Sequence, residues 1–274
     1  MSLGIVIVDT LPDKRCARDA VERTLRNLRV DDCLVVSDEC FVAGARHVPV
    51  APLAGLSGYN ALLLDRLAGH LLCDTYLVVQ WDGFVIDGKR WQPSFQGCDY
   101  IGAPWWHRGG AVGCGGFSLR SRRLVAAVQA LRRLEAEQDV ATAEDLQVCV
   151  RHRGALEAAG FRFASTDLAA AFAFERIPDG GNVPPAFGFH GAFNFPHVLG
   201  EEETLLRLDA IVSRMPGNWR VWTLFVGNAW RCGQQTLATR LLAALALRDP
   251  RIWAQVVRAC LARGVPAGWL KAAA

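Results

Sequence analysis

Short apolar runs alternate with amphipathic segments along the first 80 residues. Residues 3–9, 33–37 and 75–79 are mostly apolar and rich in β-branched side chains, which predicts short strands buried on both faces. Between them, residues 15–28 and 59–72 place alanine and leucine at helical spacing. Strands that alternate with helices in this way predict an α/β fold with a doubly wound sheet.

The pattern changes twice further along the chain. Beyond residue 90 it is irregular, with short strands expected at residues 161–164 and 170–174 among others, and from residue 201 it is helical. In the helical part, apolar residues fit the spacing of one tetratricopeptide-type hairpin. We therefore expect an α/β domain over residues 1–199 and a helical extension over residues 200–274. The extension is predicted to pack as a cap, with an independent docking module as the alternative.

Charge and cysteine content limit the classes of partner. The formal net charge is +3, which gives no reason to expect nucleic acid as a partner. Residues 201–274 carry 10 basic and 5 acidic side chains, so a peripheral membrane or protein contact is expected there. The nine cysteines contain no C-x-x-C pair, which favours reduced, packed thiols in the cytoplasm. The chain shows neither a signal peptide nor a membrane helix, so we expect a soluble protein.

Two segments follow predicted strands at the edge where such sheets bind ligands. They are Asp9-Thr10 after the first strand and Gln80-Trp81-Asp82 after the strand at residues 75–79. An acidic residue in this place can hold a divalent cation that neutralises a diphosphate. The alternative for Asp82 is a plain turn, since Asp-Gly is a common turn pair.

Three further residues have side chains suited to chemistry. His190 lies between aromatic residues and glycines, where it is either a ligand or a packed core residue. As a ligand beside oxygen donors it would suit Mn²⁺ better than Mg²⁺. Glu144 and Asp145 follow Thr142 in a capping-box pattern at an expected helix start. A carboxylate there could accept a proton from a hydroxyl nucleophile, or it could only interact with the helix dipole.

A glycine-rich segment at residues 113–116 lacks the lysine of a phosphate-binding P-loop, and the dinucleotide fingerprint is absent from the chain. ATP hydrolysis and NAD binding through these motifs are therefore disfavoured. Trp105 and Trp106 precede this segment. They are expected either to stack on a sugar or to anchor a hydrophobic loop.

The order of these motifs resembles a bacterial family of unassigned function that is related to GT-A nucleotide-sugar glycosyltransferases. The resemblance covers residues 3–196 and rests on the Tyr-Asn pair at 59–60 and on five segments: Gln-Trp-Asp-Gly at 80–83, Asp-Tyr-Ile-Gly-Ala-Pro-Trp at 99–105, Gly-Cys-Gly-Gly-Phe-Ser-Leu-Arg-Ser at 113–121, Glu-Asp at 144–145 and Phe-Gly-Phe-His-Gly at 187–191. Two departures are Gln80, at the usual first acid of the D-x-D metal motif, and Cys114, at a usual asparagine.

The resemblance implies a GT-A-like mixed sheet and a role for each motif. Asp145, or else Glu144, would be the catalytic base, and Asp82 and His190 would hold Mn²⁺ or Mg²⁺. The donor would be bound by Asp9, Thr10, Tyr59, Asn60, Gln80, Trp81 and Asp82. The acceptor would be bound by Trp105, Trp106, Cys114, Gly115 and Gly116.

The implied activity is a metal-dependent hexosyl transfer from a nucleotide-sugar to a glycan or lipid-linked hydroxyl. The expected setting is bacterial surface polysaccharide synthesis in the cytoplasm, at the inner membrane. A nucleotidyltransferase is the first alternative, although the loop after the first strand lacks the glycines that it needs. A non-catalytic adaptor that acts through the helical tail is the second.

Overall fold

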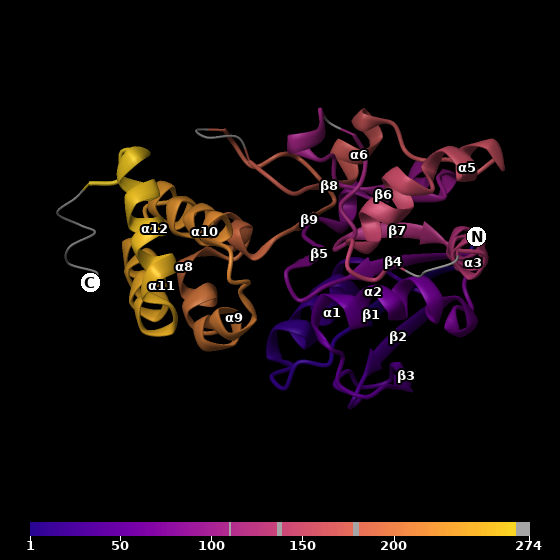
Figure 1. Cartoon of the computed structure of the whole chain (residues 1–274), viewed down its shortest axis with the longest axis horizontal. Coiled ribbons are helices and arrows are strands. Elements are labelled where there is room, and N and C mark those ends of the chain that lie inside the picture. Colours follow the sequence, from indigo (N-terminus) through magenta and orange to yellow (C-terminus); the bar gives the residue numbers. More distant parts are fainter. Residues whose placement is uncertain (110, 136–138, 178–180, 267–274) are drawn as a thin grey trace. The chain divides into compact units, whose positions relative to one another are not determined.

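The computed structural model describes residues 1–109, 111–135, 139–177 and 181–266 (Figure 1). The chain divides into two compact units. The first comprises Met1–Arg176 with Pro184–His190, and the second comprises Ile177–Val183 with Gly191–Ala274. The domain boundary expected after residue 199 remains a prediction.

A six-stranded mixed sheet forms the centre of the first unit. In spatial order its strands are β3 (Arg46–Pro49), β2 (Asp32–Ser37), β1 (Leu3–Val8), β4 (Thr75–Val79), β7 (Ser118–Ser121) and β6 (Tyr100–Gly102). The first four are parallel, whereas β7 runs antiparallel to both of its neighbours. Every residue of β1 and β4 is buried, as expected of strands covered on both faces.

Helices cover the sheet of the first unit. They are α1 (Arg15–Asn27), α2 (Gly55–Asp65), α3 (Arg122–Arg133), α4 (Glu144–Leu146), α5 (Arg153–Ala158) and α6 (Thr166–Phe172). On one face, Val6, Val36 and Val78 of the strands share a core with Leu62 of α2 and Val125 of α3. The predicted mixed α/β class is therefore confirmed.

A small second sheet carries part of the candidate site. In it β9 (Gly188–His190) lies between β5 (Gly83–Val85), which is antiparallel to it, and β8 (Ala173–Phe174), which is parallel. The register pairs Gly83 with His190. The hairpin after β4 and the distant His190 are thereby brought together.

Three expected elements differ in the structure. The strand expected at residues 170–174 is reduced to β8, because residues 166–172 form α6, whose first turn is capped by the hydroxyl of Ser165 accepting from the Leu168 N–H. Residues 161–164 form only an isolated bridge between Phe163 and Tyr100. The helix expected through residue 72 ends at Asp65 and is followed by a 3₁₀ turn, Leu67–His70.

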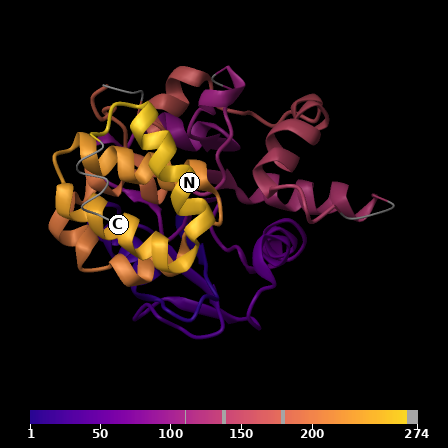
Figure 2. The ribbon, with the colours of Figure 1, turned by 60° about the vertical axis from the view of Figure 1, so that its left-hand side comes forward.

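The second unit is helical, as predicted. Its helices are α7 (Phe195–Val198), α8 (Gly200–Leu205), α9 (Leu208–Arg214), α10 (Trp219–Arg231), α11 (Gln235–Arg248) and α12 (Pro250–Ala262). The last three pack against one another (Figure 1 and Figure 2). The hairpin spacing matches the buried face, since Trp222, Phe225, Ala238 and Leu242 are at most 1% exposed. No helix among the described residues is long and apolar enough to cross a membrane.

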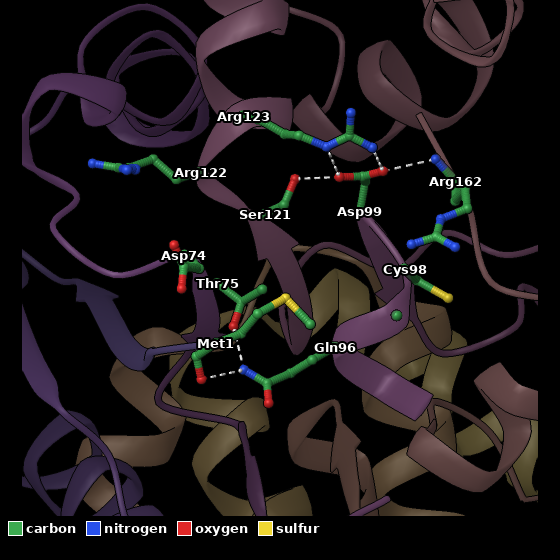
Figure 3. Close-up of a pocket in the computed structure, with 11 residues that line it drawn as sticks. Met1, Asp74, Thr75, Gln96, Cys98, Asp99, Ser121, Arg122, Arg123 and Arg162 are labelled. Atoms are coloured by element: carbon green, nitrogen blue, oxygen red, sulfur yellow. Dashed lines mark hydrogen bonds and ion pairs between the residues drawn. The ribbon is translucent and has the colours of Figure 1, made fainter. Parts of the chain in front are cut away.

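A hollow of about 430 Å³ lies at the amino-terminal edge of β1 and β4, where Thr75 and Ser121 face each other in register. Figure 3 shows Asp99 at its wall, bound by the Ser121 hydroxyl at 2.6 Å, by the Arg123 guanidinium and by the Arg162 N–H at 2.9 Å. Together these groups hold the pKa of Asp99 below its ordinary value although burial raises it. This hollow is at the opposite edge of the sheet from the predicted ligand site.

Candidate active site

The two predicted ligand segments lie at the carboxyl edge of β1 and β4. Asp9 is 6% exposed, and its side chain accepts a hydrogen bond from the Leu11 N–H at 3.0 Å. The Thr10 hydroxyl accepts from the Leu53 N–H at 3.0 Å. Lys14, which the sequence analysis did not single out, is buried and places its Nζ 2.6 Å from Asp38 Oδ1. A buried cation therefore stands at this edge, beside two carboxylates.

Gln80 and Gly83 form a tight hairpin after β4. Each donates its N–H to the carbonyl of the other at 3.0 Å, so Trp81 and Asp82 occupy the turn. The turn expected as the alternative for Asp82 is present, and it brings the side chain to a second functional group. Asp82 Oδ1 lies 3.7 Å from Nε2 of His190.

His190 has polar partners on both sides of its ring. Its Nε2 lies 3.3 Å from Gln80 Oε1 as well as near Asp82, and its Nδ1 lies 3.4 Å from Cys114 Sγ and 3.6 Å from Glu175 Oε1. Burial disfavours a charged ring, but Cys114, Asp82 and Glu175 hold the pKa of His190 well above its ordinary value. Burial also raises the pKa of Cys114, to about 11. The ring of His190 thus lies among polar, ligand-type groups, and its role as a ligand stays a prediction.

The glycine-rich segment fits between these groups because it lacks side chains. A Cβ on Gly116 would lie 2.1 Å from His190 Nε2, and one on Gly115 would lie 1.9 Å from Glu144 Oε1. Between Gly113 and Gly115, Cys114 adopts a φ of 51°, the one positive value among the non-glycine residues that the structure describes. That conformation is costly for most side chains and is tolerated best by glycine and asparagine.

A Gly116→Ala substitution should lower the free energy of unfolding by about 1–3 kcal/mol, because the added methyl overlaps His190 Nε2 and Gln80 Oε1. Both neighbours are held by β9 and by the hairpin, so they have little room to move. Urea denaturation would measure the change. Gly154→Ala is the control, since nothing lies within 4 Å of its added Cβ. Equal stability of the two variants would contradict the close packing.

Glu144 and Asp145 have different environments. Glu144 is 4% exposed and accepts two hydrogen bonds from the buried Arg120, at 2.7 and 2.8 Å. Asp145 is half-buried; its Oδ2 accepts from the Gly115 N–H at 3.1 Å and its Oδ1 from the Leu146 N–H at 2.8 Å. Burial, then the charge of Glu144, raises the pKa of Asp145. Asp145 is thus the better placed of the two to exchange a proton.

Tyr59 and Asn60 reach the same region from α2. The Tyr59 hydroxyl accepts a hydrogen bond from the Gln80 amide at 2.6 Å, and burial, followed by the negative charge of Glu144, raises its pKa. Asn60 is fully buried, and its amide oxygen accepts from the Glu144 N–H at 3.2 Å. Its amide nitrogen donates to the carbonyls of Val140 and Thr142. Asn60 therefore holds the segment that carries Glu144 and Asp145.

Trp105 packs against the first residue of the glycine-rich segment. Trp105 is 3% exposed and its indole covers Gly113, whose Cβ would lie 2.1 Å from the ring. Of its two predicted roles, this packing is that of a loop anchor. Trp106 begins a short 3₁₀ turn, Trp106–Arg108, and its side chain is outside the described part of the structure.

Sequence reasoning missed Arg120 and Glu175 as well as Lys14. Arg120 lies within the quoted glycine-rich motif, and no local pattern distinguishes it from the exposed arginines that follow it. Glu175 directly follows β8, and only the pairing of β8 with β9 shows that it comes near His190.

Residues 44–190 match the model of a protein family described as "Protein of unknown function (DUF5672)". The chain belongs to this family. The match includes every predicted site residue except Asp9 and Thr10. A comparison with curated proteins finds no match.

Solved structures show remote similarity. Apo-form glycosyltransferase GlyE of Streptococcus pneumoniae TIGR4 has a TM-score of 0.42 and 9% identity, over 79% of this chain and 52% of that chain. This chain thus spans about half the length of GlyE. TarS 1-349 of S. aureus has a TM-score of 0.40 and 10% identity, over 94% and 90%. A197 from STIV has a TM-score of 0.35 and 14% identity, over 60% and 80%.

Proposed function

We propose that the chain transfers a sugar from a nucleotide-sugar donor to a hydroxyl of a glycan or lipid-linked acceptor. The observation that carries the proposal is the position of Gly115 and Gly116 at the carboxyl edge of the sheet. Gly115 lies against Glu144 and donates its N–H to Asp145. Gly116 lies against Gln80 and His190. A base and a group of cation- or phosphate-type ligands are thereby separated only by backbone.

The reaction needs a proton acceptor next to the attacking hydroxyl. In the proposed step the acceptor oxygen forms a bond to the anomeric carbon, the bond from that carbon to the diphosphate oxygen breaks, and the hydroxyl proton passes to Asp145. The leaving group is the nucleoside diphosphate. The raised pKa of Asp145 suits this role, because a base works best when its pKa approaches the working pH. The charge of Glu144 is balanced by Arg120, which makes Glu144 the weaker candidate.

A divalent cation would supply charge compensation for the diphosphate. The resemblance assigns Mn²⁺ or Mg²⁺ to Asp82 and His190, and the contact of 3.7 Å between them supports a shared ligand site. Gln80 is a weaker ligand for these hard cations than the acid it replaces, because its amide oxygen carries no charge.

The setting of the reaction is proposed as bacterial surface polysaccharide synthesis on the cytoplasmic side of the inner membrane. The basic excess of residues 201–274 supports a contact with an anionic surface there. The adaptor role of this tail and the nucleotidyltransferase alternative stay predictions.

The proposal is tested by a thermal-shift screen of UDP, GDP, dTDP and CMP, with and without Mn²⁺. A nucleotide that binds the folded chain raises its melting temperature by mass action. Asp82→Ala should abolish donor turnover and keep the fold, whereas the exposed Asp167→Ala should change neither. Normal turnover in Asp82→Ala would overturn the site, and the lack of a shift with every nucleotide would overturn the activity.

A further inference from the structure

We propose that Cys114, Glu175 and His190 form a binding site for a thiolate-accepting divalent cation of the Zn²⁺ class. The site lies on the Nδ1 side of His190, away from the Asp82 contact that the resemblance implies. The ligand atoms, one from each residue, all lie within 4.8 Å of one another. The inference does not depend on the proposed sugar transfer.

The two separations measured from His190 Nδ1 fit one metal ion. Nδ1 of His190 lies 3.4 Å from Cys114 Sγ and 3.6 Å from Glu175 Oε1. With bonds of about 2.3 Å to sulfur and about 2.0 Å to nitrogen and oxygen, those separations correspond to angles of about 105° and about 130° at the metal. The first angle is close to tetrahedral. The second becomes tetrahedral if Nδ1 of His190 and Oε1 of Glu175 move slightly closer together. Three protein ligands leave one position for water or another oxygen, as in zinc sites that are not purely structural.

The donor chemistry selects against the hard cations. A thiolate with an imidazole and a carboxylate suits Zn²⁺, whereas Mg²⁺ and Mn²⁺ prefer oxygen donors. On the Nε2 side of His190, Asp82 is accompanied by the neutral amide oxygen of Gln80. On the Nδ1 side, a sulfur and a second carboxylate oxygen are both present. The residues of this chain thus fit a softer metal than the one the resemblance implies.

The fold positions each ligand independently. His190 ends β9 and Glu175 directly follows β8, and these strands are paired in the small sheet. Cys114 comes from the glycine-rich loop, where a positive φ directs its side chain toward the ring. Gly116 lets His190 approach because it has no Cβ to collide with Nε2.

The far side of the ring also matches a ligating histidine. Such a histidine donates its second N–H to a carboxylate or carbonyl oxygen, which fixes the orientation of the ring. Nε2 of His190 has Gln80 Oε1 at 3.3 Å for this purpose, and Asp82 Oδ1 lies 3.7 Å away. Gln80 would then orient the ring, and Asp82 would lie beside it without binding the metal itself.

The experiment is a titration of the chelator-treated full chain with Co²⁺, without donor or acceptor, and then displacement by Zn²⁺. A thiolate-to-Co²⁺ charge-transfer band is expected, and Zn²⁺ should abolish it and raise the melting temperature. Cys114→Asn should remove the band and weaken Co²⁺ binding more than about 100-fold, since even a partner outside the ligand set costs about 10–100-fold. Asparagine tolerates the positive φ, so this variant should stay folded.

Matched variants make the result decisive. Glu175→Gln should weaken Co²⁺ binding while the band remains, and Cys40→Ser, which changes an exposed thiol, should leave both unchanged. Asp82→Asn should keep the band, because Asp82 is not one of the three proposed ligands. The proposal is overturned if folded wild-type protein shows no band, if the band survives in Cys114→Asn, or if Mn²⁺ binds more tightly than Zn²⁺. None of these results tests nucleotide binding, which the thermal-shift screen measures separately.

Discussion

An Asp145→Asn variant should lose about 100-fold or more in kcat/KM for sugar transfer while its affinity for the donor nucleotide is unchanged. The substitution keeps the shape of the side chain, and an amide oxygen can still accept the Gly115 N–H, now at 3.1 Å from Oδ2. It removes the ability to take up a proton. The loss should therefore appear in turnover and not in donor binding, as measured by initial rates and by nucleotide titration.

The pH profile of the same enzyme gives a second readout. Asp145 acts as a base only when it is deprotonated, so the rate should fall as the pH is lowered through its pKa. Burial and the charge of Glu144 raise that pKa, which places the fall at a higher pH than the value of about 3.9 for an exposed aspartate. The residual rate of Asp145→Asn should lack this acidic limb.

Asp167→Asn is the matched control, since it changes an exposed carboxylate of α6 in the same unit. Its rate and pH profile should equal those of the wild type. If Asp145→Asn kept normal turnover with the same acidic limb, another group would be the base and the assignment would be wrong.

The sheet could be predicted from the sequence because its central strands are short apolar segments with clear ends. β1 and β4 are continuous apolar runs, and their ends place Asp9 and Gln80 at one edge. The prediction was wrong for residues 170–172 because a short alanine- and phenylalanine-rich segment suits either state. The Ser165 cap, which satisfies the Leu168 N–H, accompanies the helical state.

The site could be predicted only as a set of motifs. Their order along the chain indicated which side chains matter, but not which ones touch. The helix start at Glu144 was expected from a capping box at Thr142, yet Ala143 occupies the cap position and makes no side-chain cap. The Glu144 N–H is bound instead by Asn60, 84 residues away. A local sequence pattern cannot predict this hydrogen bond, because only the folded chain brings α2 next to Glu144.

Breaking the Arg120–Glu144 pair should have the largest effect on stability. Both residues are at most 5% exposed, and the guanidinium binds both carboxylate oxygens. Arg120 also donates to the Gly115 carbonyl at 3.2 Å and to the Ser118 hydroxyl at 2.9 Å. Glu144→Gln leaves that guanidinium buried without its counter-charge, so the free energy of unfolding should fall by about 3–5 kcal/mol in urea denaturation.

Two comparisons separate the buried pair from an ordinary ion pair. Glu157→Gln removes the exposed partner of Arg153, whose Nε lies 2.9 Å from it, and should cost less than about 0.5 kcal/mol. Arg120→Met with Glu144→Leu removes both charges together and should be less destabilising than the sum of the single changes.

Arg120 donates to the Gly115 carbonyl, and the Gly115 N–H donates to Asp145. The double variant should therefore still lose turnover even where its stability recovers. If Glu144→Gln were as stable as Glu157→Gln, the stabilising role of the buried Arg120–Glu144 pair would be contradicted. Full turnover in the double variant would show that this pair does not support the active site.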